Sequence, residues 1–108
     1  MYADIKREGE APTKEPWQDV LERAACLLQT EGWIQRQLKG VHGRCVMGAI
    51  AAASGDQMLS FFTTEAAVRL ATHLDVFSLA AWNDAPWRTR AEVVAALNEA
   101  ARGESRCS

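Results

Sequence analysis

A glycine-containing loop at residues 40–45, Gly-Val-His-Gly-Arg-Cys, leads into a wholly apolar segment. If that segment is a helix, its free N–H groups and the positive end of its dipole favour an anion at the loop. Arg44 could hold a carboxylate or a phosphate there through two parallel hydrogen bonds. The loop has neither the Gly-Lys-Ser/Thr ending of a Walker A motif nor the spacing of a dinucleotide-binding fingerprint. Two interpretations stand side by side, an anion site and a structural turn that carries a surface arginine, and the turn is favoured.

Cys45 begins the same apolar segment and follows an arginine. A thiol at such a position is a better nucleophile than an ordinary cysteine. His42 or His73 could serve as its base. Asp84 or Asn83 could then orient that base, which would make a cysteine-dependent enzyme. No local motif fixes the distance from Cys45 to either histidine, and cysteine is among the most often buried residue types. We therefore expect a buried thiol and keep the enzyme as an alternative.

Cysteines and histidines are scattered along the chain, at positions 26, 42, 45, 73 and 107. None of them forms a Cys-x-x-Cys or His-x-x-x-His unit, the spacings typical of zinc sites. The odd number of cysteines also differs from the disulfide framework of a secreted domain and fits a reducing compartment. The sequence predicts free thiols, no metal site and no cofactor.

A second polar loop, residues 82–89, reads Trp-Asn-Asp-Ala-Pro-Trp-Arg-Thr. Asn83 and Asp84 favour a tight turn because their side chains bond nearby backbone. Asp84 could also lock the loop by pairing with Arg44 or Arg88. Turn chemistry leaves unexplained why two tryptophans stand beside an arginine, a combination typical of binding surfaces.

Basic residues gather in the first loop without an acidic residue between Gly32 and Asp56 to balance them. If the two loops meet at one end of the fold, they form a basic, aromatic-lined recess suited to an anion or an acidic protein surface. The candidate binding residues are Arg36, Lys39, His42, Arg44, Trp82, Asn83, Asp84, Trp87 and Arg88.

The segments on either side of these loops have apolar residues at helical spacing, so we expect helices to position the loops. Apolar residues recur at helical spacing from Pro16 until Gly32, and an all-round apolar helix rich in small residues follows at about 45–54. Thr63 is a plausible N-cap for a third helix that ends near Leu74. Residues 76–81 could add a short turn ending at Trp82. Thr89 and Glu92 match a capping box for a last helix closed by Gly103, and no convincing strand pair is visible.

A chain of 108 residues with 48% hydrophobic and 24% charged residues has room for one modest core. We predict an all-α fold, a compact single-domain bundle of four main helices around the central small-residue helix. Residues 1–14 are expected to be a flexible arm, residues 15–103 the helical domain and residues 104–108 a tail. No apolar run is long enough to span a bilayer, and no signal peptide is visible, so a cytoplasmic protein without membrane attachment is expected.

Three segments together resemble a known family: Gly32-Trp33, then the Cys-x-x-Gly-Ala element within 43–53, then the Trp-Asn-Asp element within 82–93. The chain is similar, over about residues 17–102, to an uncharacterised family of small actinobacterial and actinophage proteins classed as a domain of unknown function. Trp87 stands where the family pattern has a glycine. The resemblance implies no substrate or catalytic residue. It implies a setting in which small phage-type accessory proteins act by binding a host protein or a signalling nucleotide.

We predict a non-enzymatic binding protein that engages a host protein or a small anionic, nucleotide-like ligand through loops 36–45 and 82–89. A cysteine-dependent enzyme centred on Cys45 is the first alternative. The second is nucleic-acid binding through a local patch of Arg36, Lys39, Arg44, Arg88 and Arg90. The net charge of −2 and the absence of a clear recognition helix argue against nucleic acid. The sequence does not define an oligomeric state.

Overall fold

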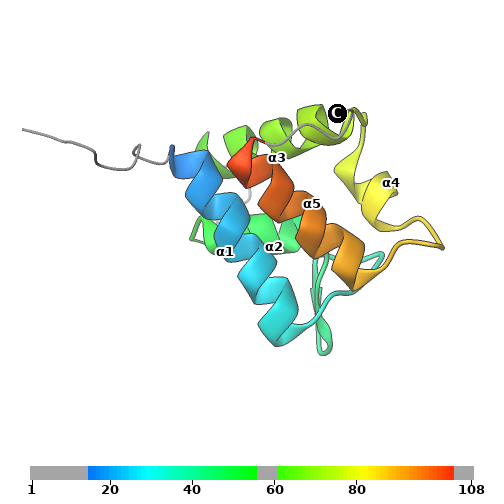
Figure 1. The fold of residues 1–108 in the computed structure, drawn as a ribbon. Helices are drawn as coiled ribbons and strands as arrows, with labels where there is room; N and C mark the ends of the chain where they lie inside the picture. Colours follow the sequence, from blue (N-terminus) through cyan, green and yellow to red (C-terminus); the bar gives the residue numbers. More distant parts are fainter. Residues whose placement is uncertain (1–14, 56–60, 104–108) are drawn as a thin grey trace, which may run out of the picture.

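The computed structural model describes residues 15–55 and 61–103. Within these ranges the chain is mostly helical, with α1 (Pro16–Glu31), β1 (Lys39–Gly40), β2 (Gly43–Arg44), α2 (Val46–Ala53), α3 (Phe61–Leu74), α4 (Leu79–Asn83) and α5 (Arg90–Arg102). α1 and α5 run antiparallel side by side, α3 lies across one end of this pair, and the hairpin projects at the other end (Figure 1). The predicted arm at 1–14 and tail at 104–108 lie outside the described residues.

α1 begins and ends where the sequence predicts. Pro16 occupies the first turn, where its missing N–H costs nothing, and the Gln18 side chain accepts a 2.7 Å hydrogen bond from the Glu15 backbone N–H. Gly32 ends the helix with a φ of 104°, which side chains rarely tolerate. The Gln18 amide also donates to the Ala101 carbonyl at 2.7 Å, which ties the start of α1 to the end of α5.

α1 is the element on which the other long helices pack. It contacts α5, α2 and α3. The fully buried side chains that join them include Leu21, Leu28, Ile50, Leu70 and Leu97. The sequence predicts that the other helices pack around the small-residue helix at 45–54. This prediction is wrong for α5, which packs mainly against α1. The reason is length, because α2 has 8 residues whereas α1 has 16 and runs along the whole of α5.

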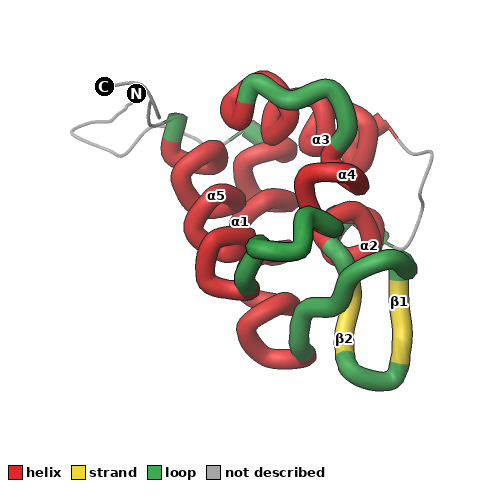
Figure 2. The backbone as a smooth tube through the Cα atoms, turned by 90° about the vertical axis from the view of Figure 1, so that its right-hand side faces the viewer, coloured by secondary structure: helices red, strands yellow, loops and turns green. Residues whose placement is uncertain are grey.

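A two-stranded antiparallel hairpin corrects the all-α prediction. Lys39 pairs with Arg44 and Gly40 with Gly43, and the hairpin stands out from the helices (Figure 2). The strands have two residues each, too short to show an alternating pattern in the sequence. Residues 32–34 add a parallel bridge on the other side of β2, through bonds from the Ile34 N–H to the Arg44 carbonyl (3.0 Å) and from the Arg44 N–H to the Gly32 carbonyl (3.2 Å).

α3 and α4 begin at places that differ from the prediction. Thr63 is not an N-cap: it lies inside α3, is 1% exposed, and its hydroxyl contacts the hydroxyl of Ser54 at the end of α2. The short turn expected at 76–81 is the helix α4, whose N-cap Ser78 accepts a 3.1 Å hydrogen bond from the Ala81 N–H. The described part of the chain therefore has five helices where four main ones are predicted.

α5 confirms the predicted capping box. The Thr89 hydroxyl accepts from the Glu92 N–H at 3.2 Å, and the Glu92 carboxylate accepts from the Thr89 N–H at 3.1 Å. Gly103 closes the helix in the left-handed conformation. Among the described helices, none is both long enough and apolar enough to cross a membrane.

Candidate binding site

The two loops singled out by the sequence meet in the structure. The Gln35 side-chain N–H groups donate to the carbonyls of Asn83 (2.9 Å) and Ala85 (2.8 Å). The Asp84 carboxylate accepts from the backbone N–H of Arg36 at 2.8 Å. Gln35 makes two of these bonds and is not a predicted site residue, because an isolated glutamine carries no pattern that reveals a partner some 50 residues away.

Asn83 is fully buried at the centre of this junction. Its side-chain oxygen accepts from the Trp33 indole N–H (2.6 Å) and from the Val46 backbone N–H (3.0 Å). Its amide nitrogen donates to the Ile34 carbonyl (3.2 Å) and to the Asp84 carboxylate (2.9 Å). Because all of these partners belong to the protein and the side chain is out of contact with solvent, Asn83 holds the fold together and is not open to a ligand.

Asp84 supports the backbone of the first loop. The side-chain hydrogen bond from Asn83 and then the backbone N–H of Arg36 hold the pKa of the Asp84 carboxyl below its usual value of 3.8. The N–H that Asp84 accepts belongs to a residue with a φ of 72°, a rare conformation for arginine that this bond helps to hold. The predicted pairing of Asp84 with Arg44 or Arg88 is wrong, because its carboxylate bonds Asn83 and Arg36 instead.

This geometry predicts a pH dependence. Since the pKa of Asp84 is lowered in the folded protein, its ionised form adds stability that is present above pH 3.8 and lost as pH falls through the folded pKa. We expect Asp84→Asn to lower the free energy of unfolding at neutral pH and the difference from wild type to shrink below about pH 3.8. Urea unfolding of both proteins at several pH values measures this. A difference that stays constant down to about pH 2 would contradict it.

The two predicted anion-binding arginines are largely covered and already bonded. The Arg44 side chain is 16% exposed and its Nε lies 3.4 Å from the Glu31 carboxylate. Glu31 stands just before the interval from Gly32 to Asp56, in which no acidic residue balances the basic ones. The Arg88 side chain is 13% exposed, donates from Nε to the Trp82 carbonyl at 2.8 Å and stacks 4.4 Å over the Trp82 ring. Both arginines therefore stabilise the fold through contacts within the protein.

Cys45 caps α2. Its buried sulfur accepts from the Gly48 N–H at 3.4 Å, so that this sulfur and Asn83 use two of the N–H groups at the start of the helix. His42 is exposed at the turn of the hairpin, and His73 lies on α3 with its Nε2 3.6 Å from a Glu99 oxygen. In residues 15–55 and 61–103, neither histidine hydrogen-bonds to Cys45, and no three candidate ligands cluster as a metal site would require.

An open recess of about 630 Å³ lies against the second loop, lined by residues 76–78, 81–82 and 84–88. We call it the aromatic recess. Trp87 is 72% exposed there and Phe77 is completely exposed. Phe77 is absent from the predicted site, and its only signal in the sequence is an aromatic residue between the end of one helix and the cap of the next. It also borders a second recess of about 300 Å³ formed with α3 and α4.

The exposed basic residues of the first loop do not line the aromatic recess. Arg36, Lys39 and His42 are exposed on the hairpin and its approach, whereas Trp82, Asp84, Trp87 and Arg88 line the recess. The single basic, aromatic recess built from both loops is therefore not formed. The loops join through their backbones and buried side chains instead.

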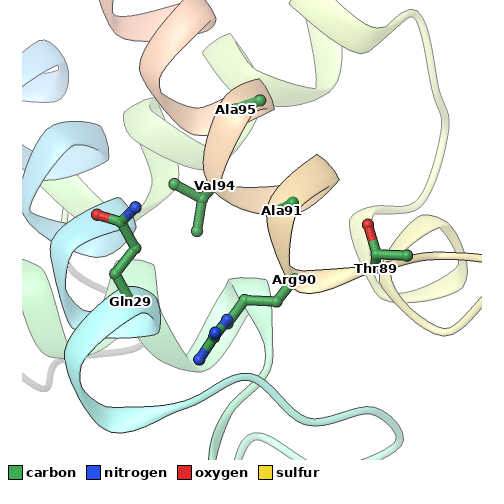
Figure 3. Close-up of a pocket in the computed structure, with 6 residues that line it drawn as sticks. All are labelled: Gln29, Thr89, Arg90, Ala91, Val94 and Ala95. Carbon is green, nitrogen blue, oxygen red and sulfur yellow. The ribbon is translucent and has the colours of Figure 1, made fainter.

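A separate groove of about 610 Å³ runs between α1 and α5 (Figure 3). Figure 3 shows Gln29 on α1 and Arg90 at the start of α5 on its two sides, with Val94 between them. The Thr89 hydroxyl at its edge is occupied in the capping box. The groove has no exposed aromatic residue, which distinguishes it from the aromatic recess.

The fold and this surface define a small, mostly helical domain in which buried polar side chains join two loops and aromatic side chains stand exposed beside them. The chain belongs to the family of unknown function DUF6197, whose model matches residues 12–103. Comparison with curated proteins and with solved structures finds no match.

Proposed function

We propose that this chain is a non-enzymatic binding protein and that the aromatic recess is its protein-binding surface. The observation that carries the proposal is the exposure of Phe77 and Trp87 at one open recess of about 630 Å³. Exposed aromatic side chains leave apolar area in water, and clusters of them mark interaction sites on soluble proteins. Tryptophan is also among the residues that contribute most to binding free energy when an interface covers them.

A protein partner fits this surface better than a small anionic ligand does. The arginines that could clamp an anion, Arg44 and Arg88, are bonded to carboxylates and largely covered. The recess itself is open and mainly apolar, as a surface for a partner's side chain would be. The accessory role in a bacterium or a phage, acting on a host protein, is part of this proposal and rests on analogy.

The two rival functions have less support. A cysteine enzyme needs a base within hydrogen-bond reach of the thiol, and the Cys45 sulfur instead accepts from Gly48. Nucleic-acid binding would use the exposed Arg36, Lys39 and Arg90 only, since Arg44 and Arg88 are engaged in the fold. The three exposed cations left in this patch, on a chain of net charge −2, supply little of the electrostatic attraction that such binding requires.

Phe77→Ala and Trp87→Ala are expected to weaken binding of the partner at least about tenfold each, as substitutions of central interface aromatics do. Both side chains are exposed, so the melting temperature should change little. The measurement is quantitative affinity capture from the lysate of the organism that encodes the protein, with the two variants and wild type compared protein by protein.

Val41→Ala is the matched control. Val41 is 96% exposed at the tip of the hairpin, away from the recess, so its loss removes exposed apolar surface without touching the proposed interface. If Val41→Ala lowers recovery of the captured partner as much as Trp87→Ala does, or if Phe77→Ala and Trp87→Ala leave recovery unchanged, the aromatic recess is not the binding surface.

A further inference from the structure

A third recess, of about 340 Å³, lies between α1, α3 and α5 and includes neither Phe77 nor Trp87. Trp17 contributes from α1, Arg69, Thr72 and His73 contribute from α3, and the end of α5 completes the wall. We call it the Trp17 recess. Its volume falls at the lower end of the range for small-molecule sites, which runs from about 300 to 1,000 Å³.

Two buried nitrogen atoms at the Trp17 recess lack a hydrogen-bond partner. They are Trp17 Nε1 and His73 Nε2, and neither finds a partner among the described residues. The His73 side chain is 9% exposed, and an oxygen of Glu99 lies 3.6 Å from Nε2, too far for a hydrogen bond. The indole N–H can only donate, so it can be satisfied only by an acceptor brought from elsewhere. Unpaired buried polar groups are rare in folded proteins and call for an explanation.

Other hydrogen-bonding side chains lie beside the Trp17 indole N–H at this recess. The Arg69 guanidinium lies 4.7 Å over the Trp17 ring, and Thr72 offers a hydroxyl. Arg69 is 53% exposed, and within residues 15–55 and 61–103 it pairs with Glu65 at a long distance of 3.5 Å. Such an exposed pair contributes little stability, so the Arg69 side chain can move away from the tryptophan at small cost.

We propose that the Trp17 recess binds a small organic monocarboxylate. Its apolar body packs against the walls formed by Trp17, Val68 and Ala100. Its carboxylate replaces Glu65 as the partner of Arg69, and a shift of the Trp17 and Arg69 side chains on binding brings the buried indole N–H within its reach. Two acids flank the site, Glu65 on Arg69 and Glu99 beside His73, and they disfavour a dianion such as phosphate.

The test is a titration of the ¹⁵N-labelled protein with sodium benzoate, followed through the indole N–H signal of Trp17, which Trp17→Phe identifies. We expect a saturable shift with a dissociation constant of about 1 mM or below. Benzamide, the neutral analogue, and inorganic phosphate should bind at least about tenfold more weakly. Arg69→Gln should raise the dissociation constant for benzoate at least about fivefold.

Arg23→Gln is the control, because Arg23 is an exposed arginine on α1 that pairs with Asp19 one turn away and does not line the recess. It should bind benzoate as wild type does. Three results would each overturn the proposal: no saturable shift up to about 20 mM benzoate, equal binding of benzamide, or equal binding by wild type and Arg69→Gln. The spectrum of each variant shows directly whether it is folded, and Arg69→Lys, which keeps the charge but not the paired donors, should bind with intermediate strength.

Discussion

Gly48→Ala is expected to destabilise the protein by about 3 kcal/mol or more, or to prevent its folding, because it places a methyl group against backbone that cannot move away. A Cβ at position 48 would lie 1.9 Å from the Leu38 carbonyl oxygen. That oxygen accepts the Cys45 N–H at 3.2 Å, so a shift of Leu38 would also break the bond that seats the hairpin against α2.

Gly40→Ala is the matched control for this prediction. A Cβ there would meet the ends of the Ile34 and Gln37 side chains at 3.1 Å, and flexible side-chain ends can give way where backbone cannot. Chemical denaturation of the two variants and wild type measures the difference. Equal stability of Gly48→Ala and Gly40→Ala would show that the loop does not cross α2 as closely as the structure has it.

Asn83→Ala is expected to lower the free energy of unfolding by about 3–5 kcal/mol, since it strips several buried groups of their hydrogen bonds at once. The Trp33 indole N–H and the Val46 N–H both lose their acceptor, and the Ile34 carbonyl loses a donor. Leaving one such group unsatisfied in the interior costs about 1–3 kcal/mol. The loss should appear in the urea midpoint and as a changed environment of Trp33.

Two comparisons make the Asn83 prediction specific. Asn98→Ala, at a partly buried position on α5, should cost far less. Asn83→Asp keeps an acceptor for Trp33 and Val46 but loses the donor and sets a second carboxylate beside Asp84, so it should also be strongly destabilising at neutral pH. If Asn83→Ala melts within a few degrees of wild type, the junction between the loops is not held by this side chain.

The boundaries of the long helices α1 and α5 could be predicted because residues close to each helix end determine where it begins or stops. Pro16 and Gly32 bound α1, and the Thr89–Glu92 capping box and Gly103 bound α5, each within one turn of the helix end that it defines. The start of α3 could not be predicted in this way. Thr63 has the right residue type for a cap, but its hydroxyl is used across the fold, by Ser54 of α2, and local sequence does not carry that information.

The hairpin and the loop junction depend on contacts between distant residues. Gly32 and Gly43 are needed because their backbones press against each other: a Cβ on Gly43 would lie 2.3 Å from the Gly32 carbonyl. Gln35 bonds residues about 50 positions away. Strands of two residues and single long-range bonds leave no periodic signal, so these features become visible only in three dimensions.

The candidate site shows why residue type alone does not assign a role. Arg44, Asn83 and Arg88 have side chains that could hydrogen-bond or pair with a ligand, but in the structure they bond the protein's own carboxylates, carbonyls and N–H groups. Trp87, an aromatic residue in a loop, stands exposed. The number of bonds that a polar residue makes inside the protein decides between the two roles, and this number is a property of the structure.

Docking of a protein partner at the aromatic recess can be detected in the cell by site-directed photo-cross-linking. A photo-cross-linking amino acid would replace, one at a time, Phe77, Trp87 and the control Val41, in cells of the organism that encodes the protein. We expect positions 77 and 87 both to cross-link to the same protein, whereas position 41 should not. Cross-linking from position 41 alone, or no cross-link from either position in the recess, would contradict it.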